Sequence, residues 1–385
     1  MSFAKKLGAK NSQINSVLEG KQLVKGFNNS NYPLLDKPQQ LSVSDKEDLK
    51  EASNEAIKST INRSHKLQKP YIPRKNFNSI IATLIIDKIW RIVTLKNLFS
   101  FFTQDELQEC VNRVCLHDFQ LLANMFEIPT LDMAIDLAIL SLFDITLLLD
   151  DSGSMTIDEN KDGSSRFFVL TEVCKTISFF STLMDEDGIS LRFLHNKNEG
   201  DNLKTFEEIQ NLMSKVSPSG STPIGKKIKT RIFERMISKN LTEGTLKKPV
   251  LLIIITDGIP DYENDVINTI KECREKCISS KYGENAMSFS FVQIGTDKSA
   301  TKYLDKLDNH PIIGKMIDCT SCFEIESNQC LSRYNIELTP GSYLIKLLLG
   351  PIDPNYDEMD EINEIPIAKS SAISSKKNKS IFSFF

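Results

Sequence analysis

Five side chains with oxygen donors stand in three separate segments of the chain, and together they could bind a metal ion. They are Asp150, Ser152, Ser154, Thr222 and Asp257. Hard divalent cations prefer oxygen, and Mg²⁺ accepts one or two carboxylates, with hydroxyls and water completing an octahedron. Gly153 gives the turn between the two serines the flexibility to fold back toward Asp150. These residue types and spacings predict a site for Mg²⁺ or Mn²⁺.

The charge of such a site indicates what else could bind there. Two carboxylates only balance a divalent ion. If Asp257 binds through water, the ion keeps much of its electrophilicity and an open position. We therefore expect a protein partner that presents an Asp or Glu carboxylate.

Apolar runs lead into two of the three segments. Residues 145–149 end at Asp150, and residues 250–255, the most hydrophobic run of the chain, end at Thr256, Asp257 and Gly258. Continuous apolar runs are typical of parallel strands, and ligands of open α/β sheets gather at the carboxyl ends of such strands. We expect both segments, and the SPSGSTP loop that carries Thr222, to meet at one edge of a sheet.

Strands and helices alternate around these segments. Helices are expected over residues 166–184, 206–216, 224–237, 266–278 and 300–307, and further strands over 189–194, 288–294 and 316–317. Residues 196–202 are expected to form a polar loop. This alternation predicts an α/β fold with a doubly wound, mostly parallel sheet.

The rest of the chain divides by composition. We expect a polar, largely disordered N-terminal arm (1–75), a helical flank (76–142), the α/β domain (143–325), a C-terminal helical extension (326–367) and a disordered basic tail (368–385). Ser44 with Glu47 predicts one helix inside the arm, and Thr103 with Glu106 predicts the start of a helix in the flank, because each pair forms a capping box. Residues 340–349 could form a helix of the extension.

Composition narrows the partners and the compartment. A formal net charge of −4 disfavours nucleic acid, which is bound by polycationic surfaces. The apolar stretch 131–149 contains Asp132, Asp136 and Asp144, which would be costly in lipid, so no transmembrane segment is expected. The first residues lack the apolar core of a secretory signal. We expect a cytoplasmic protein, with the nucleus not excluded.

The two ends of the chain are basic. Residues 1–75 hold 14 Lys and Arg against 7 Asp and Glu, and the tail holds four lysines and no acids. These ends could make weak contact with an acidic membrane surface, although a solvated linker is the simpler interpretation for the arm.

Eight cysteines do not indicate a zinc site. Cys319 and Cys322 have zinc-knuckle spacing, but Cys273 and Cys277 do not, and no His pair follows. Reduced, partly buried thiols are expected.

At the five oxygen-bearing residues the chain resembles a von Willebrand factor type A (vWA) domain of the intracellular kind. The metal-ion-dependent adhesion site of that family combines the pattern Asp-x-Ser-x-Ser with a distant Thr and a distant Asp, and all three parts are present here in order. The resemblance covers about residues 143 to 325. It implies a Rossmann-like vWA fold and an interaction module.

The resemblance also assigns roles to the five residues. It implies that Asp150, Ser152 and Ser154 bind the metal. Thr222 would join them in a ligand-competent state, and Asp257 would bind directly or through water.

Two enzyme families offer alternatives. In a haloacid-dehalogenase-like phosphatase an apolar strand also ends in Asp, and Asp150 and Thr256 fit that outline. Ser152, however, stands where such an enzyme has the aspartate that protonates the leaving group. Residues 220–226 match the GxxxxGK pattern of a phosphate-binding loop, but Lys227 replaces the Ser or Thr required for magnesium, and a helix is expected before the loop. We expect no catalytic activity.

Two neighbouring residues are harder to interpret. Asp151 should point away from Asp150, as a solvated or strand-edge carboxylate. His195, at a strand end, could approach the site or be an ordinary surface histidine.

Overall fold

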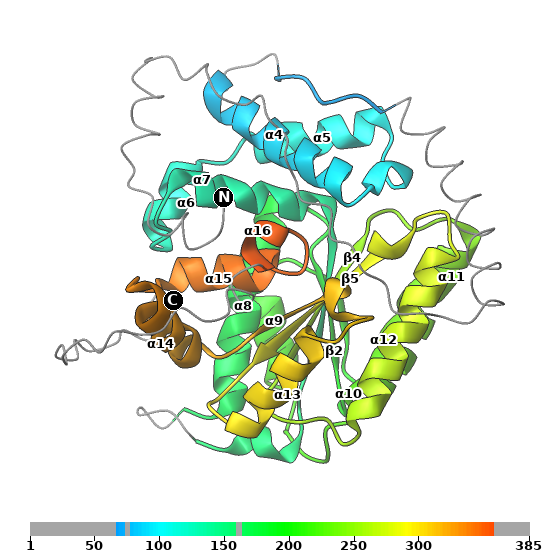
Figure 1. Cartoon of the computed structure of the whole chain (residues 1–385), viewed down its shortest axis with the longest axis vertical. Coiled ribbons are helices and arrows are strands. Elements are labelled where there is room, and N and C mark those ends of the chain that lie inside the picture. Colours follow the sequence, from blue (N-terminus) through cyan, green and yellow to red (C-terminus); the bar gives the residue numbers. More distant parts are fainter. Residues whose placement is uncertain (1–66, 74–77, 159–163, 358–385) are drawn as a thin grey trace.

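A computed structural model describes residues 67–73, 78–158 and 164–357. A six-stranded sheet runs through them in the order β3-β2-β1-β4-β5-β6 (Figure 1). The strands are β1 (Asp144–Leu149), β2 (Ile189–Phe193), β3 (Gly200–Leu203), β4 (Val250–Thr256), β5 (Met287–Gln293) and β6 (Ile317–Thr320). All neighbours are parallel except β2 and β3, which are antiparallel. The predicted α/β fold with a mostly parallel sheet is confirmed.

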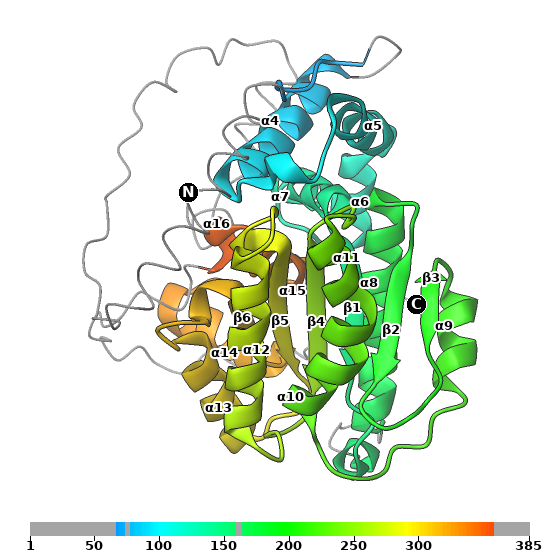
Figure 2. The same ribbon diagram turned by 90° about the vertical axis from the view of Figure 1, so that its right-hand side faces the viewer.

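The central strands are covered on both faces. All seven residues of β4 are buried, which explains its uninterrupted apolar sequence. Helices α10 (Ile224–Lys227), α11 (Ser238–Glu243) and α12 (Glu263–Ile278) lie on one face, and α8 (Arg166–Met184) and α15 (Pro340–Leu349) lie on the other (Figures 1 and 2). The sheet is therefore doubly wound.

The helices that precede β1 form the helical flank. They are α4 (Ser79–Leu95), α5 (Gln104–Val114), α6 (Phe119–Met125) and α7 (Leu131–Asp136). They lie at the end of the sheet where the parallel strands begin, so they leave the opposite, carboxyl edge uncovered (Figure 1). The Thr103–Glu106 capping box opens α5, as predicted.

Polar contacts tie the flank to the C-terminal part of the described chain. Arg91 of α4 donates to Asp353, with 3.0 Å between Nη1 and Oδ1. The hydroxyl of Tyr356, in α16 (Pro354–Asp357), donates to the buried carboxylate of Asp136. Segments at the two ends of the described chain thus pack against each other.

The remaining helices complete the alternation. They are α9 (Phe206–Met213), α13 (Lys298–Asp308) and α14 (Phe323–Tyr334), a π-helical stretch (Ile228–Ile237) between α10 and α11, and 3₁₀ turns at Leu98–Ser100, Leu137–Leu142, Gly153–Thr156, Glu284–Ala286 and Gly314–Met316.

Several elements differ from the sequence prediction. Strand β3 occupies part of the expected polar loop 196–202. Its sequence Gly-Asp-Asn-Leu has little strand propensity, and it is a strand because its backbone pairs with the edge of β2. Helices α6 and α14 were not predicted as individual helices, although α6 lies in the predicted helical flank and most of α14 lies in the predicted helical extension. The helix expected from Ser44 lies outside the described residues.

Helix α8 is the one described helix that is long and apolar enough to cross a membrane, but 61% of its apolar window is buried inside the structure. It buries Leu170, Ile177 and Phe180 in the common core.

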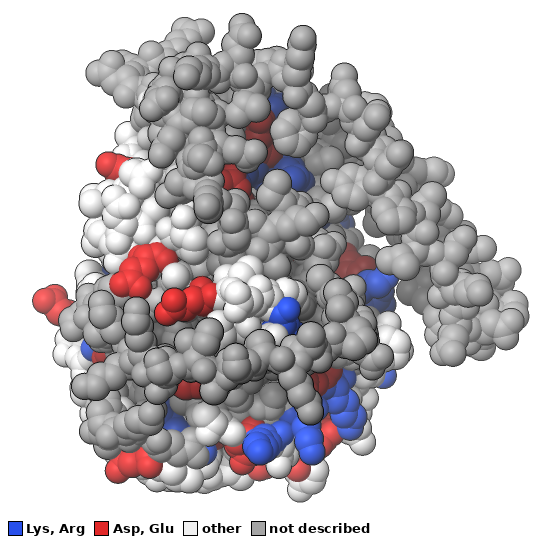
Figure 3. Space-filling model, turned by 60° about the vertical axis from the view of Figure 1, so that its left-hand side comes forward, with Lys and Arg blue, Asp and Glu red and all other residues white. Residues whose placement is uncertain are grey.

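On the face shown in Figure 3, basic side chains gather toward the lower edge with acidic side chains among them.

Candidate functional site

Two neighbouring strands place the two aspartates of the predicted site at one edge of the sheet. Asp150 directly follows β1 and Asp257 directly follows β4, and these strands pair in parallel. The amide of Asp150 donates to the carbonyl of Ile255 at 2.9 Å, so the pairing continues to the last residues of both strands. Both carboxylates are 1% exposed. The strand-end argument from sequence therefore locates them correctly.

The two serines lie between these carboxylates. Ser152 Oγ is 3.1 Å from Ser154 Oγ, and Ser154 Oγ donates to Asp257 Oδ1 at 2.9 Å. Asp150 is held by two donors, the Ser152 amide at 2.8 Å from Oδ1 and the Thr256 hydroxyl at 2.6 Å from Oδ2. The structure thus brings four of the five predicted side chains into one hydrogen-bonded group.

The spacing of this group suits a small divalent cation. Mg²⁺ binds oxygen at about 2.0–2.1 Å in an octahedron, so oxygens on adjacent corners lie about 2.9 Å apart. The separations of 3.1 Å between the two serine hydroxyls and 2.9 Å between Ser154 and Asp257 are hydrogen bonds of ordinary length, and they are also compatible with that edge length. The donors are also carboxylates and hydroxyls, which magnesium and manganese accept. The residues present fit the predicted ion.

Thr222 lies beside this group on the loop between α9 and α10. The loop is joined to the Asp150 loop by two backbone hydrogen bonds, Gly153 N to Gly220 O at 3.0 Å and Ser219 N to Asp151 O at 2.7 Å. The Thr222 amide donates to Asp261 Oδ1 at 2.8 Å. Among the described residues no hydrogen bond joins the Thr222 hydroxyl to the other four side chains, so its role as a ligand stays a prediction.

A glycine allows the Thr222 loop to approach so closely. Gly220 has φ of +91°, in the left-handed region, and a Cβ there would lie 3.0 Å from ring atoms of His195. The His195 Nε2 atom lies 2.5 Å from the carbonyl oxygen of Ser221. His195 therefore contacts the loop that carries Thr222. Of the two interpretations of His195 that the sequence left open, approach to the site is the one that applies.

Asp151 differs from the sequence prediction. It is not a solvated carboxylate, because it is 1% exposed, and it lies just beyond the end of β1. Its Oδ1 and Oδ2 accept the amides of His195 at 2.8 Å and Asn196 at 2.7 Å. The prediction failed because the two amides that Asp151 binds lie 44 and 45 residues further along the chain. Contacts over such a separation have no signal in the local sequence around Asp151.

Sequence reasoning also missed Arg166, the first residue of α8. Its Nη1 atom lies 2.6 Å from Asp257 Oδ2, and both side chains are buried, with 8% and 0% exposed. Arg166 also helps to hold the pKa of Asp297 below its usual range, after the amides of Ser299 and Ala300. A single arginine at the start of an apolar helix does not indicate from sequence that it binds Asp257, which lies 91 residues further along the chain.

Burial shapes the electrostatics of the site. It raises the pKa of Asp150 to about 6, and the negative charge of Asp257 adds to the rise, while hydrogen bonds from Thr256 and Ser152 oppose it. A carboxylate pair in so little water is costly without a positive charge nearby. Arg166 supplies one such charge from the chain itself.

A cavity of about 330 Å³ adjoins the Thr222 loop. Its lining includes His195, Ser221, Pro223, Lys227, Asp261 and Tyr262.

The residues 220–226 that match a phosphate-binding loop follow helix α9. A helix was expected before this loop, whereas a phosphate-binding loop follows a strand.

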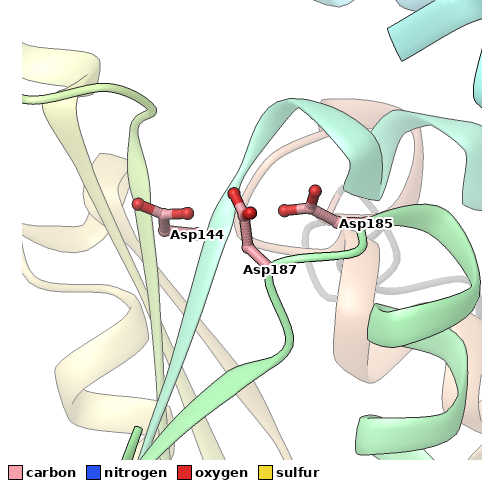
Figure 4. Close-up of side chains that lie close together, drawn as sticks. All are labelled: Asp144, Asp185 and Asp187. Carbon is pink, nitrogen blue, oxygen red and sulfur yellow. The ribbon is translucent and has the colours of Figure 1, made fainter. Parts of the chain in front are cut away.

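A second acidic group lies at the opposite edge of the sheet. Asp144 at the start of β1 and Asp185 and Asp187 before β2 have carboxylate oxygens within 4.8 Å of one another and could hold a metal ion (Figure 4). Lys248 already occupies this group, with Nζ 2.5 Å from Asp185 and 3.2 Å from Asp187. Burial raises the pKa of Asp144 to about 6. The lysine ammonium provides the counter-charge that a metal would otherwise supply.

No disulfide joins any of the eight cysteines, all of which lie in the described part of the chain.

Comparison with known proteins gives little further information. No protein-family model matches the chain, and no curated protein matches it significantly. Among solved structures, the crystal structure of manganese-loaded Plasmodium vivax TRAP protein matches with 15% identity over 52% of this chain and 75% of that chain, at a TM-score of 0.31. A match with so low a TM-score supports no conclusion about this chain. The interpretation of the site therefore depends on the geometry of its own residues.

Proposed function

We propose that the chain is an intracellular, metal-dependent protein-binding module of the vWA type. Asp150, Ser152 and Ser154 would hold a Mg²⁺ or Mn²⁺ ion, with Asp257 binding directly or through water. Thr222 would join the ion when a partner binds. The observation that carries the proposal is the convergence of Asp150, Ser152, Ser154 and Asp257 in one hydrogen-bonded group at the carboxyl ends of β1 and β4.

The bound ion would supply an electrophilic position for one carboxylate of a partner protein. The chain's own residues would bind the ion and orient its ligands. Thr256 and the Ser152 amide orient the Asp150 carboxylate. The resemblance of the Asp-x-Ser-x-Ser, Thr and Asp pattern to vWA domains supports this division of roles.

Exposed apolar side chains on the same loops support a protein partner. Ile157 lies three residues after Ser154 and is 45% exposed, and Ile259 and Tyr262 follow Asp257 and are 39% and 71% exposed. Apolar and aromatic residues next to a polar anchor are typical of protein-binding surfaces. A partner's acidic side chain would therefore be flanked by apolar ones.

The alternative, a magnesium-dependent phosphatase, has less support. Asp150 and Thr256 fit its outline, and they are hydrogen-bonded to each other. Ser152 stands at the position of the general acid, and its hydroxyl contacts Ser154. A serine hydroxyl is a poor proton donor to a leaving group. We therefore propose that the chain is not an enzyme.

Thermal unfolding with Mg²⁺ or Mn²⁺ tests the metal site. An ion that binds only the folded chain stabilises it by about 2.7 kcal/mol at 100 times its Kd. We expect the melting temperature of the wild type to rise and that of Asp150→Ala to change far less. Asp144→Asn is the matched control, because it removes a carboxylate from the opposite acidic group. Equal responses in the wild type and Asp150→Ala would refute the site.

Affinity capture tests the partner. The wild type and a Ser152→Ala/Ser154→Ala variant are compared with and without EDTA, followed by an aryl phosphate assay in Mg²⁺. Partners lost both on chelation and on substitution support the module. A partner set unchanged by either treatment contradicts it, and turnover abolished by Asp150→Asn favours the phosphatase.

A further inference from the structure

Arg166 places a permanent positive charge against a predicted metal ligand. Its guanidinium binds Asp257 Oδ2 at 2.6 Å, while the other oxygen of that carboxylate accepts from Ser154 at 2.9 Å. The two sides of one carboxylate therefore face the arginine and the predicted ion. An arginine stays protonated at every physiological pH, so this charge cannot be removed by titration.

The arginine is held in place by backbone contacts. The Arg166 amide donates to the carbonyl of Ile157 at 3.0 Å, and Asp158 and Ser165 form a β-bridge beside it. The Ser165 hydroxyl then caps α8 by accepting the amide of Phe168. Arg166 is 7% exposed and its guanidinium is bound to Asp257, so it is not presented on the surface to a partner. Its effect must act through Asp257 and the ion.

We infer that Arg166 makes metal binding and partner binding depend on each other. The inference rests on the proposed function. Among the three charged side chains joined at the site, Asp150 and Asp257 carry two negative charges and Arg166 carries one positive charge, so a divalent ion leaves this trio with one net positive charge. Without the arginine the same site would be neutral. The ion is then held loosely when alone and more tightly when an external carboxylate neutralises the excess charge.

This coupling has a consequence for selectivity. A neutral site would retain its ion and bind a partner carboxylate weakly. The positively charged site binds carboxylates in preference to neutral hydrogen-bonding groups. Arg166 is therefore a positioning and charge-setting residue, and it does not touch the partner.

Calorimetric titration with MnCl₂ tests the inference, with sodium acetate as a probe for the partner's carboxylate. Kd for Mn²⁺ is measured in chloride and in acetate at equal ionic strength. For Arg166→Gln, which can still donate to Asp257 but carries no charge, we expect Kd in chloride at least tenfold lower than in the wild type. Arg166→Lys should bind like the wild type, and a merely structural role would not produce this rescue by charge.

Acetate provides a second readout, and its effect on the wild type does not depend on any variant folding. It should tighten Mn²⁺ binding to the wild type several-fold and to Arg166→Gln by a smaller factor. An unchanged wild-type Kd in acetate, or equal or weaker Mn²⁺ binding by a folded Arg166→Gln, overturns the inference and leaves the proposed metal site intact. Absence of Mn²⁺ binding by every protein overturns both.

Discussion

Replacing Thr256 by valine removes one hydroxyl from the centre of the site and keeps the shape of the side chain. Thr256 is 2% exposed, and its Oγ1 donates to Asp150 Oδ2 at 2.6 Å. Asp150 is 1% exposed, so water cannot replace the lost donor. Hydrogen bonds to charged groups contribute about 1.5–3 kcal/mol. We expect Thr256→Val to lower the free energy of unfolding by about 2 kcal/mol.

Urea unfolding at pH 7.5 in EDTA measures this loss, because the chelator removes any contribution from bound metal. The midpoint should fall while the slope with urea stays constant, which indicates a change in stability alone. Thr256→Ser keeps the hydroxyl and is the matched control, and it should lose less than Thr256→Val. A loss below about 0.5 kcal/mol for valine, or equal losses for both variants, would refute the claim that this hydroxyl holds Asp150.

Three further predictions concern the surrounding structure. Burial raises the pKa of Asp144 to about 6, above the value near 3.9 of an unfolded chain, so its ionisation costs stability as pH rises from about 4 to about 6. Asp144→Asn should therefore raise stability at pH 7.5 by about 1–3 kcal/mol and have little effect near pH 4, and an equal gain at both pH values would contradict this cause. Gly220→Ala should lower the melting temperature, because φ is +91° and its Cβ would meet the His195 ring at 3.0 Å; an unchanged melting temperature would show that the loop relaxes. Lys346 and Glu326 form a pair 2.8 Å apart with 1% and 5% of the side chains exposed, so Lys346→Met should cost about 3–5 kcal/mol in urea unfolding. The double variant with Glu326→Leu should recover part of that loss, and a larger loss in the double variant would exclude charge burial as the reason.

The parts of the fold that were predicted correctly have local sequence signals. The apolar run 250–255 was predicted to be a strand and is a fully buried one, and the Thr103–Glu106 pair correctly marked the start of α5. Strand β3 could not be predicted, because its hydrogen bonds to β2 and not its side chains make it a strand. Helix α14 has few apolar positions, and its buried Glu326 depends on a lysine 20 residues away.

The residues of the site also divide into those with a local sequence signal and those without one. Asp150 and Asp257 could be located from sequence because each follows an apolar run, and the ends of neighbouring parallel strands meet. Asp151 and Arg166 were misjudged or missed because their partners are far away in the chain. The contact between Arg166 and Asp257 spans 91 residues, and only the folded structure reveals it.

The central claim is that one divalent ion binds among the oxygens of Asp150, Ser152, Ser154 and Asp257. Counting bound Mn²⁺ by electron paramagnetic resonance tests it most directly. We predict one bound ion per chain for the wild type and for Asp144→Asn, and none for Asp150→Ala at the same free Mn²⁺ concentration. An ion retained by folded Asp150→Ala, or lost from folded Asp144→Asn, would contradict the claim.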